Sequence, residues 1–208
     1  MKAIIFDFDG VINDVPKIQV VAGTKTFLDF KIDITKEDLA YIMPRHPIDY
    51  AKHFVEKYGL DEQEIIKKHQ NYFLSNYDTV ELMPNAREVL LQLKENHKIA
   101  LATSSPLAPV LRLFDKLKLN NIFDVIVTFD DCKERKPSPE VYNKAIAKLN
   151  MESKNCYIVE DSVVGITAGN LAGATSIAFK NQYNGYEDFS CANYTIKSLT
   201  DISEVVKQ

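Results

Sequence analysis

The sequence has few cysteines and no long hydrophobic run. Among its 208 residues, the cysteines at positions 132, 156 and 191 are odd in number and lack the spacing of a zinc site. This pattern argues against disulfides and favours a reducing compartment. No apolar stretch approaches the roughly 20 residues of a membrane span, and the segment Met1–Asp7 reaches a carboxylate too early for a signal peptide. We therefore expect a cytoplasmic protein with no membrane partner.

The sequence also lacks an excess of positive charge. It has 25 Lys and Arg residues against 29 Asp and Glu residues, for a net charge of -4 at pH 7. This balance argues against nucleic acid as a partner. Hydrophobic residues make up 46% of the chain, which allows a sizeable core at this length. The pattern gives no oligomer signal, so we expect a monomer or a small homo-oligomer.

Short, continuous apolar runs predict strands that are covered on both faces. The predicted strands are Lys2–Phe6, Lys98–Ala102, Val125–Thr128, Cys156–Val159 and Thr175–Phe179. Apolar residues at helical spacing follow in the segments Ala86–Asn96, Leu107–Leu117 and Pro139–Leu149. This alternation of strand and helix predicts an α/β fold with a doubly wound parallel sheet and a Rossmann-like core.

The segment from residue 15 to residue 80 contains no convincing strand. It contains apparent helices at Lys17–Phe30, Lys36–Met43, Ile48–Tyr58 and Glu62–Asn76. Thr35 is a capping candidate, with acidic residues behind it. We expect an inserted α-helical cap domain at 15–80, hung on a core made of 1–14 and 81–208.

Acidic side chains follow two of the predicted strands. Asp7 and Asp9 come directly after the first strand, and Gly10 permits a sharp turn there. Glu160 and Asp161 follow the fourth strand. Because ligands bind at the carboxyl ends of strands in an open parallel sheet, we expect these four carboxylates to surround one site.

Two further motifs are expected at the same edge of the sheet. Thr103 follows the second strand, with Ser105 as a candidate cap for the next helix. A hydroxyl and backbone N–H groups at this point form an anion site, although hydroxyls at helix starts are usually only caps. Pro137 holds Lys136 outside the following helix, which suits a cation presented to phosphate and equally suits a surface lysine.

Four carboxylates in one pocket require a counter-charge. Each pair at about 4 Å costs about 4 kcal/mol at an effective dielectric constant of about 20. A hard divalent cation relieves this repulsion, and ligation by oxygen alone favours Mg²⁺. We therefore expect Mg²⁺ as the cofactor, close to Asp7, Asp9, Glu160 and Asp161.

Four ordered motifs give the chain a family resemblance. They are Asp7-Phe8-Asp9-Gly10-Val11, Thr103 after an apolar strand, Lys136-Pro137-Ser138-Pro139 and Glu160-Asp161-Ser162. The chain resembles the haloacid dehalogenase superfamily of phosphotransferases, particularly its β-phosphoglucomutase and phosphoglycolate phosphatase-like branch with a helical cap. The resemblance covers the core almost from end to end.

The resemblance implies a role for each motif residue. Asp7 would attack phosphorus to form an aspartyl-phosphate, and Asp9 would act as acid and then as base. The phosphoryl oxygens would be bound by Thr103 and the amide of Ser104, with Lys136 neutralising charge. Mg²⁺ would be held by Asp7, Asp161 and the carbonyl of Asp9, with Glu160 supporting it directly or through water. Arg45 lies roughly where relatives contact substrate, although a solvated basic surface explains it equally well.

These roles predict a Mg²⁺-dependent phosphatase that hydrolyses a small phosphorylated metabolite, of the sugar phosphate or phosphoglycolate type. A sugar-phosphate mutase resembling β-phosphoglucomutase is the alternative. It is weakened by Gln19, which stands where mutases of this branch carry a cap histidine. A phospho-accepting signalling module of receiver type is a further alternative, but it would need neither Asp9 as acid nor an inserted cap.

Overall fold

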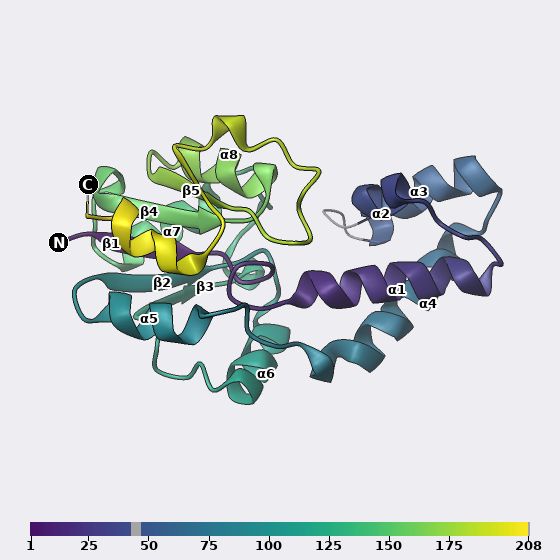
Figure 1. Ribbon diagram of the computed structural model, residues 1–208, viewed down its shortest axis with the longest axis horizontal. Coiled ribbons are helices and arrows are strands. Elements are labelled where there is room, and N and C mark those ends of the chain that lie inside the picture. The colour runs from purple at the N-terminus through teal and green to yellow at the C-terminus, as the bar shows by residue number, and fades with distance from the viewer. Residues whose placement is uncertain (43–46, 208) are drawn as a thin grey trace. The chain divides into compact units, whose positions relative to one another are not determined.

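Two compact units make up the chain in this computed structural model, which describes residues 1–42 and 47–207. We call Met1–Asn13 together with Glu81–Gln208 the core unit, and Asp14–Val80 the helical unit. The helical unit is therefore an insertion, after the first strand, into the sequence of the core unit (Figure 1).

The core unit is built on a six-stranded sheet in the order β3-β2-β1-β4-β5-β6, with every neighbouring pair parallel. The strands are β1 (Ala3–Phe6), β2 (Lys98–Ala102), β3 (Val125–Val127), β4 (Cys156–Glu160), β5 (Thr175–Phe179) and β6 (Tyr194–Ile196). The five predicted strands are confirmed, with ends that shift by at most one residue. Strand β6 was not predicted; it is a three-residue edge strand whose central Thr195 is exposed.

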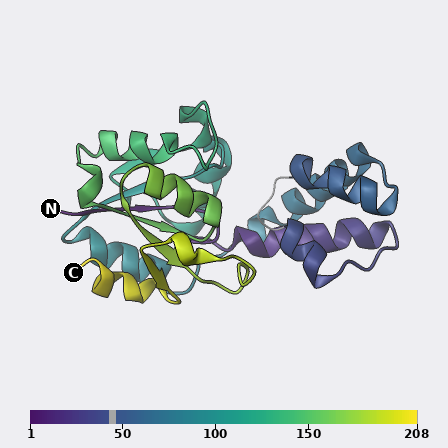
Figure 2. The same cartoon turned by 90° about the horizontal axis from the view of Figure 1, so that it is seen from above.

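Helices cover both faces of this sheet. The core helices are α5 (Ala86–Lys94), α6 (Leu107–Leu117), α7 (Glu140–Lys148), α8 (Val163–Leu171) and α9 (Ile202–Val205). Short 3₁₀ turns occur at η2 (Phe129–Asp131), η3 (Ser153–Asn155), η4 (Phe189–Cys191) and η5 (Leu199–Asp201). Tyr142 of α7 and Ala168 of α8 belong to the same buried apolar cluster as Ala3 and Ile5 of β1, whereas α5 and α9 lie on the opposite face of the sheet (Figure 2).

Strand β1 occupies the centre of the core unit. All four of its residues are fully buried, because it lies between β2 and β4 and carries helices on both faces. Burial on both faces explains why its sequence is continuously apolar rather than alternating. The predicted fold class, a doubly wound parallel sheet with an inserted helical domain, is confirmed.

The helical unit contains α1 (Val15–Asp29), α2 (Lys36–Ile42), α3 (Pro47–Tyr58), α4 (Glu62–Asn76) and the 3₁₀ turn η1 (Tyr77–Thr79). Its own core consists of buried apolar side chains, among them Phe27, Tyr50 and Phe54. Thr35 caps α2 as predicted, because its hydroxyl accepts a hydrogen bond from the Asp38 amide and the Asp38 carboxylate accepts one from the Thr35 amide. The predicted end of this helix at Met43 lies outside the described residues.

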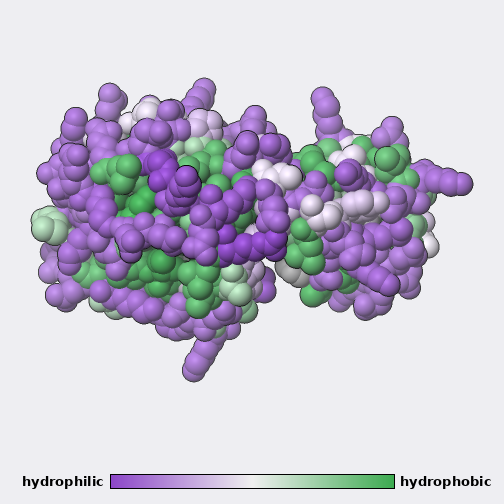
Figure 3. Space-filling view, turned by 90° about the horizontal axis from the view of Figure 1, so that it is seen from below, coloured by the Kyte–Doolittle hydropathy of each residue, from purple (hydrophilic) through white to green (hydrophobic). Residues whose placement is uncertain are grey.

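The surface mixes polar and apolar side chains. Exposed apolar residues of the core unit include Leu91, Leu107 and Leu111, and the face drawn in Figure 3 is mostly hydrophilic with hydrophobic areas between. All three cysteines are free thiols. Within the described ranges, no helix combines the length and the hydropathy that a membrane crossing requires.

Candidate active site

The turn after β1 brings two distant acidic segments together. Asp7 extends the strand by one residue, because its amide donates to the Val159 carbonyl at 2.9 Å. Gly10 then adopts a positive φ of 85°, a conformation that favours glycine. A Cβ atom at Gly10 would lie 2.0 Å from Oδ2 of Asp161. The absence of a side chain at Gly10 therefore lets the end of β4 approach the end of β1.

Three of the predicted carboxylates converge at this point. Asp7, Glu160 and Asp161 each offer one oxygen, and these oxygens lie within 4.8 Å of one another. Asp7 is 7% exposed and Glu160 is 1% exposed, so little water reaches either carboxylate. This is a set of hard oxygen donors with the composition that Mg²⁺ prefers.

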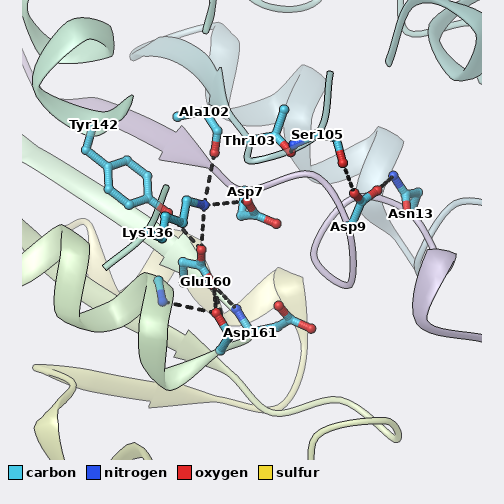
Figure 4. A network of polar contacts seen from close by, with 12 residues as sticks. Asp7, Asp9, Asn13, Ala102, Thr103, Ser105, Lys136, Tyr142, Glu160 and Asp161 are labelled. Carbon is cyan, nitrogen blue, oxygen red and sulfur yellow. Dashed lines mark hydrogen bonds and ion pairs between the residues drawn. The ribbon is translucent and has the colours of Figure 1, made fainter. Parts of the chain in front are cut away.

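Lys136 lies between two of these carboxylates (Figure 4). Its Nζ donates to Oδ1 of Asp7 at 2.5 Å, to Oε1 of Glu160 at 2.6 Å and to the Ala102 carbonyl at 3.3 Å. The side chain is only 7% exposed, and the ammonium group also faces the ring of Tyr142 at 4.7 Å. Lys136 is thus a buried, fully engaged cation rather than a surface lysine.

The Glu160 carboxylate is saturated with donors. Oε1 accepts hydrogen bonds from Lys136 and from the Tyr142 hydroxyl at 2.9 Å. Oε2 accepts from the Asp161 amide and from both the amide and the hydroxyl of Ser162. Because a carboxylate offers about four lone-pair sites, Glu160 is better suited to holding Lys136 and the β4–α8 turn than to contacting a metal directly.

Burial and neighbouring charges shift the pKa values of these side chains. Burial raises the pKa of Asp7 to about 7, although Lys136 opposes the shift. Burial, with Glu160 nearby, raises the pKa of Asp161 well above its usual value. Burial alone would lower the pKa of Lys136, but Asp7 and Glu160 outweigh it and raise that pKa. In the same way, Lys136 and the donors around Glu160 outweigh burial and lower the pKa of Glu160.

Asp9 lies apart from this cluster and has its own partners. Oδ2 of Asp9 accepts a hydrogen bond from the Ser105 hydroxyl at 2.6 Å, and Oδ1 accepts one from Asn13 at 2.9 Å. Burial raises the pKa of Asp9, and these two hydrogen bonds offset part of the rise. The expectation that Ser105 caps the next helix is wrong, because α6 begins after Pro106 and the Ser105 hydroxyl is engaged with Asp9.

Thr103 and Ser104 follow β2 at the same edge of the sheet. The Thr103 amide donates to Val127 at 3.0 Å, and its hydroxyl accepts from the Ser105 amide at 3.0 Å. Thr103 is 2% exposed, whereas Ser104 is half-buried. Ser105 therefore links the Thr103 hydroxyl to Asp9. The predicted substrate contact Arg45 lies outside the described residues.

Several polar residues of the site were missed by the sequence analysis. Tyr142 contacts Glu160 from α7, and Asn13 contacts Asp9 from the loop before the helical unit. Asn181 and Asn184 follow β5 and contact Asp161. The last two could have been found by applying to β5 the rule already applied to β1 and β4, namely that polar residues just beyond a strand end face the site.

The chain matches known proteins along most of its length. A family model described as haloacid dehalogenase-like hydrolase matches residues 4–179. A phosphorylated carbohydrates phosphatase of Thermotoga maritima is 30% identical over 181 residues, which cover 85% of this chain and 84% of that protein. A β-phosphoglucomutase of Bacillus subtilis is 31% identical over 189 residues, which cover 85% of this chain and 82% of that protein.

A solved structure agrees with these relatives. The crystal structure of a β-phosphoglucomutase from Clostridium difficile matches with a TM-score of 0.75 and 27% identity, covering 100% of this chain and 97% of that one. The family resemblance predicted from the ordered motifs is confirmed, as is the prediction of an enzyme of the hydrolase class. The chain belongs to the haloacid dehalogenase-like hydrolases.

Proposed function

We propose that the protein is a Mg²⁺-dependent phosphatase that hydrolyses a small phosphorylated metabolite through an aspartyl-phosphate on Asp7. The observation that carries this proposal is the convergence of the oxygens of Asp7, Glu160 and Asp161 within 4.8 Å, with Lys136 between two of them. The named phosphatase among its relatives supports the same class of substrate.

The donor set fits the metal that this family implies. Three carboxylates at close range, with the raised pKa values of Asp7 and Asp161, mark a place where a divalent cation lowers the energy. We propose Asp7, Asp161 and the carbonyl of Asp9 as the ligands, with Glu160 acting on them through Lys136 and the β4–α8 turn. When bound, Mg²⁺ would neutralise negative charge on the phosphoryl oxygens.

The chain's own residues would then divide the chemistry into two half-reactions. A carboxylate oxygen of Asp7 forms a bond to phosphorus while the bond from phosphorus to the leaving oxygen breaks, and Asp9 gives that oxygen its proton. In the second half, Asp9 takes a proton from water as the water oxygen attacks phosphorus, which releases phosphate and restores Asp7. Thr103 and the amide of Ser104 hold the phosphoryl oxygens, and Lys136 balances their charge.

The mutase alternative is favoured by the similarity to β-phosphoglucomutases. Gln19 argues against it, because a carboxamide side chain, unlike an imidazole, does not act as an acid or a base near neutral pH. Oε1 of Gln19 lies 2.8 Å from Nε2 of His69, and Nδ1 of His69 lies 2.6 Å from the Tyr50 hydroxyl. If Nε2 carries the proton, Tyr50 donates to Nδ1 and this chain of contacts fixes the amide of Gln19 in one orientation.

Phosphate release tests the proposal. We expect the purified protein to hydrolyse p-nitrophenyl phosphate with Mg²⁺ and to lose this activity in EDTA. Asp7→Asn should lower the rate by roughly 1,000-fold or more, because the nucleophile is gone. Asp115→Asn on helix α6 is the matched control and should leave the rate unchanged. Equal rates for the wild type and Asp7→Asn would overturn the assignment.

A panel of phosphorylated metabolites would identify the substrate class. Incubation with β-glucose 1-phosphate and its bisphosphate activator separates the two enzymes: a phosphatase releases phosphate, whereas a mutase forms the isomer faster than phosphate appears. A phosphorylated protein that persists for minutes without turnover would instead support the signalling module. The cytoplasmic location, the oligomeric state and the role of the helical unit as a cap domain stay predictions.

A further inference from the structure

Asn181, in the loop after β5, joins the two acidic segments of the site. Its Nδ2 donates to the Gly10 carbonyl at 2.9 Å and to Oδ2 of Asp161 at 3.2 Å. Gly10 belongs to the turn that follows Asp7 and Asp9, whereas Asp161 follows β4. One amide group therefore spans both segments from which the proposed ligands come.

The orientation of this amide is fixed by its other atom. Oδ1 of Asn181 accepts a hydrogen bond from the Tyr183 amide at 2.7 Å, which only an oxygen can do. The nitrogen must then face Gly10 and Asp161, whose partner atoms are both acceptors. Each of the two N–H groups has its own acceptor, so the arrangement is complete without a further partner.

Asn184 holds the same loop and the same aspartate from the other side. Its Oδ1 accepts from the Asn181 amide at 3.0 Å, and its Nδ2 donates to the carbonyls of Asp161 at 2.8 Å and Phe179 at 2.9 Å. Asn184 is 3% exposed, so these bonds are sheltered from water. Asp161 is thus fixed through its backbone by Asn184 and through its carboxylate by Asn181.

The carboxylate of Asp161 has little freedom left. Oδ2 lies against Gly10, where an added Cβ would come within 2.0 Å, and it also accepts the Asn181 hydrogen bond. These contacts restrict rotation of the Asp161 carboxylate. Restriction of this kind matters most for a metal that demands strict geometry.

We propose that Asn181 is a positioning residue for Asp161, which sets the orientation of this carboxylate and its spacing from the Gly10 turn so that the site favours Mg²⁺ over larger divalent cations. This inference rests on the proposed function, because it takes Asp161 as a metal ligand. Mg²⁺ requires near-ideal octahedral geometry at about 2.0–2.1 Å, whereas Ca²⁺ accepts flexible coordination at about 2.3–2.6 Å. Loosening Asp161 should therefore weaken Mg²⁺ binding more than Ca²⁺ binding.

Calorimetric titration of the full-length protein with each ion tests the proposal without any substrate. We expect Asn181→Ala to raise the Mg²⁺ dissociation constant about tenfold or more, as other changes to groups that orient metal ligands do. The Ca²⁺ dissociation constant should rise less than about threefold, because that ion tolerates a displaced ligand. Phosphate release measured against Mg²⁺ concentration should show the same shift.

Asn193→Ala is the matched control. Asn193 is also an asparagine that contacts β5, but it directly precedes β6, and its Oδ1 accepts from the amide and hydroxyl of Ser176, near the start of β5. We expect its removal to lower the melting temperature and to leave both dissociation constants unchanged. This control therefore separates a general loss of stability around β5 from a specific effect on metal affinity.

The outcomes distinguish this inference from the proposed function. Unchanged Mg²⁺ affinity in Asn181→Ala, or equal weakening of both ions, would overturn the inference while leaving the metal site in place. Asp161→Asn is the second arm: if it too binds Mg²⁺ as tightly as the wild type, the proposed ligand set is wrong. Should Asn181→Ala fail to fold by circular dichroism, Asn181→Ser replaces it, because a serine hydroxyl is too short to reach both acceptors.

Discussion

Removal of the Lys136 ammonium group should destabilise the metal-free protein strongly. Its Nζ lies 2.5 Å from Asp7 and 2.6 Å from Glu160, in a side chain that is 7% exposed. Each contact is worth about 6 kcal/mol of Coulomb energy at an effective dielectric constant of about 20. Desolvation of the buried ions offsets much of this, so we expect Lys136→Met to lower the free energy of unfolding by about 3–5 kcal/mol.

Urea denaturation in EDTA at pH 8 measures this change. Lys154→Met is the control, because Lys154 forms an exposed pair with Glu152, which contributes at most about 1 kcal/mol. The loss in Lys136→Met should shrink at pH 5, where Asp7 takes up a proton and one uncompensated charge disappears. If Lys136→Met lowered stability no more than Lys154→Met at pH 8, the ammonium group would not be the counter-charge that holds these carboxylates together.

Three further predictions concern neighbouring residues. Tyr142→Phe removes the donor that lies 2.9 Å from Oε1 of Glu160, so the free energy of unfolding should fall by about 1.5–3 kcal/mol in urea titrations; no change would mean that the hydroxyl has no effect on the buried carboxylate. Burial raises the pKa of Asp7 from 3.8 to about 7, so the metal-free protein should lose stability as pH rises through this interval. This loss of stability should be smaller in Asp7→Asn. Parallel profiles of stability against pH for the wild type and the variant would contradict the raised pKa of Asp7. Gly10→Ala places a Cβ atom 2.0 Å from the Asp161 carboxylate. It should abolish Mg²⁺ binding in calorimetry, while the far-UV circular dichroism spectrum stays native. Wild-type Mg²⁺ affinity in this variant would show that the Gly10 turn and Asp161 can move apart at little cost.

The central strands could be predicted from the sequence because a strand that is buried on both faces consists of a continuous run of apolar residues. Strand β6 could not, because an edge strand of three residues has one strand neighbour, β5, and an exposed central Thr195. Its formation depends on the partner strand more than on its own residues. Any helix or strand that is too short to show a hydrophobic period is equally hard to predict from the sequence.

The acidic residues of the site could be predicted because strand ends in a parallel sheet meet at one edge. The detailed partners could not. Ser105 fits a helix cap by its local pattern, but its hydroxyl donates to Asp9, which lies 96 positions away in the sequence. Tyr142 likewise fits an ordinary core position on α7 until its hydroxyl is seen to reach Glu160. Side-chain hydrogen bonds between distant segments produce no periodic pattern in the sequence from which they could be predicted.

The central position of β1 also governs the order in which the protein can fold during synthesis. Ala3 pairs with Lys98 on one side and with Cys156 on the other, so β1 has neither of its neighbouring strands until β2 has been synthesised. At a synthesis rate of about 5–20 residues per second, β4 is made about 8–30 s after β1. The helical unit, whose residues are contiguous, can close its own core during that interval, whereas β1 lacks its two neighbouring strands until β2 and β4 have been synthesised.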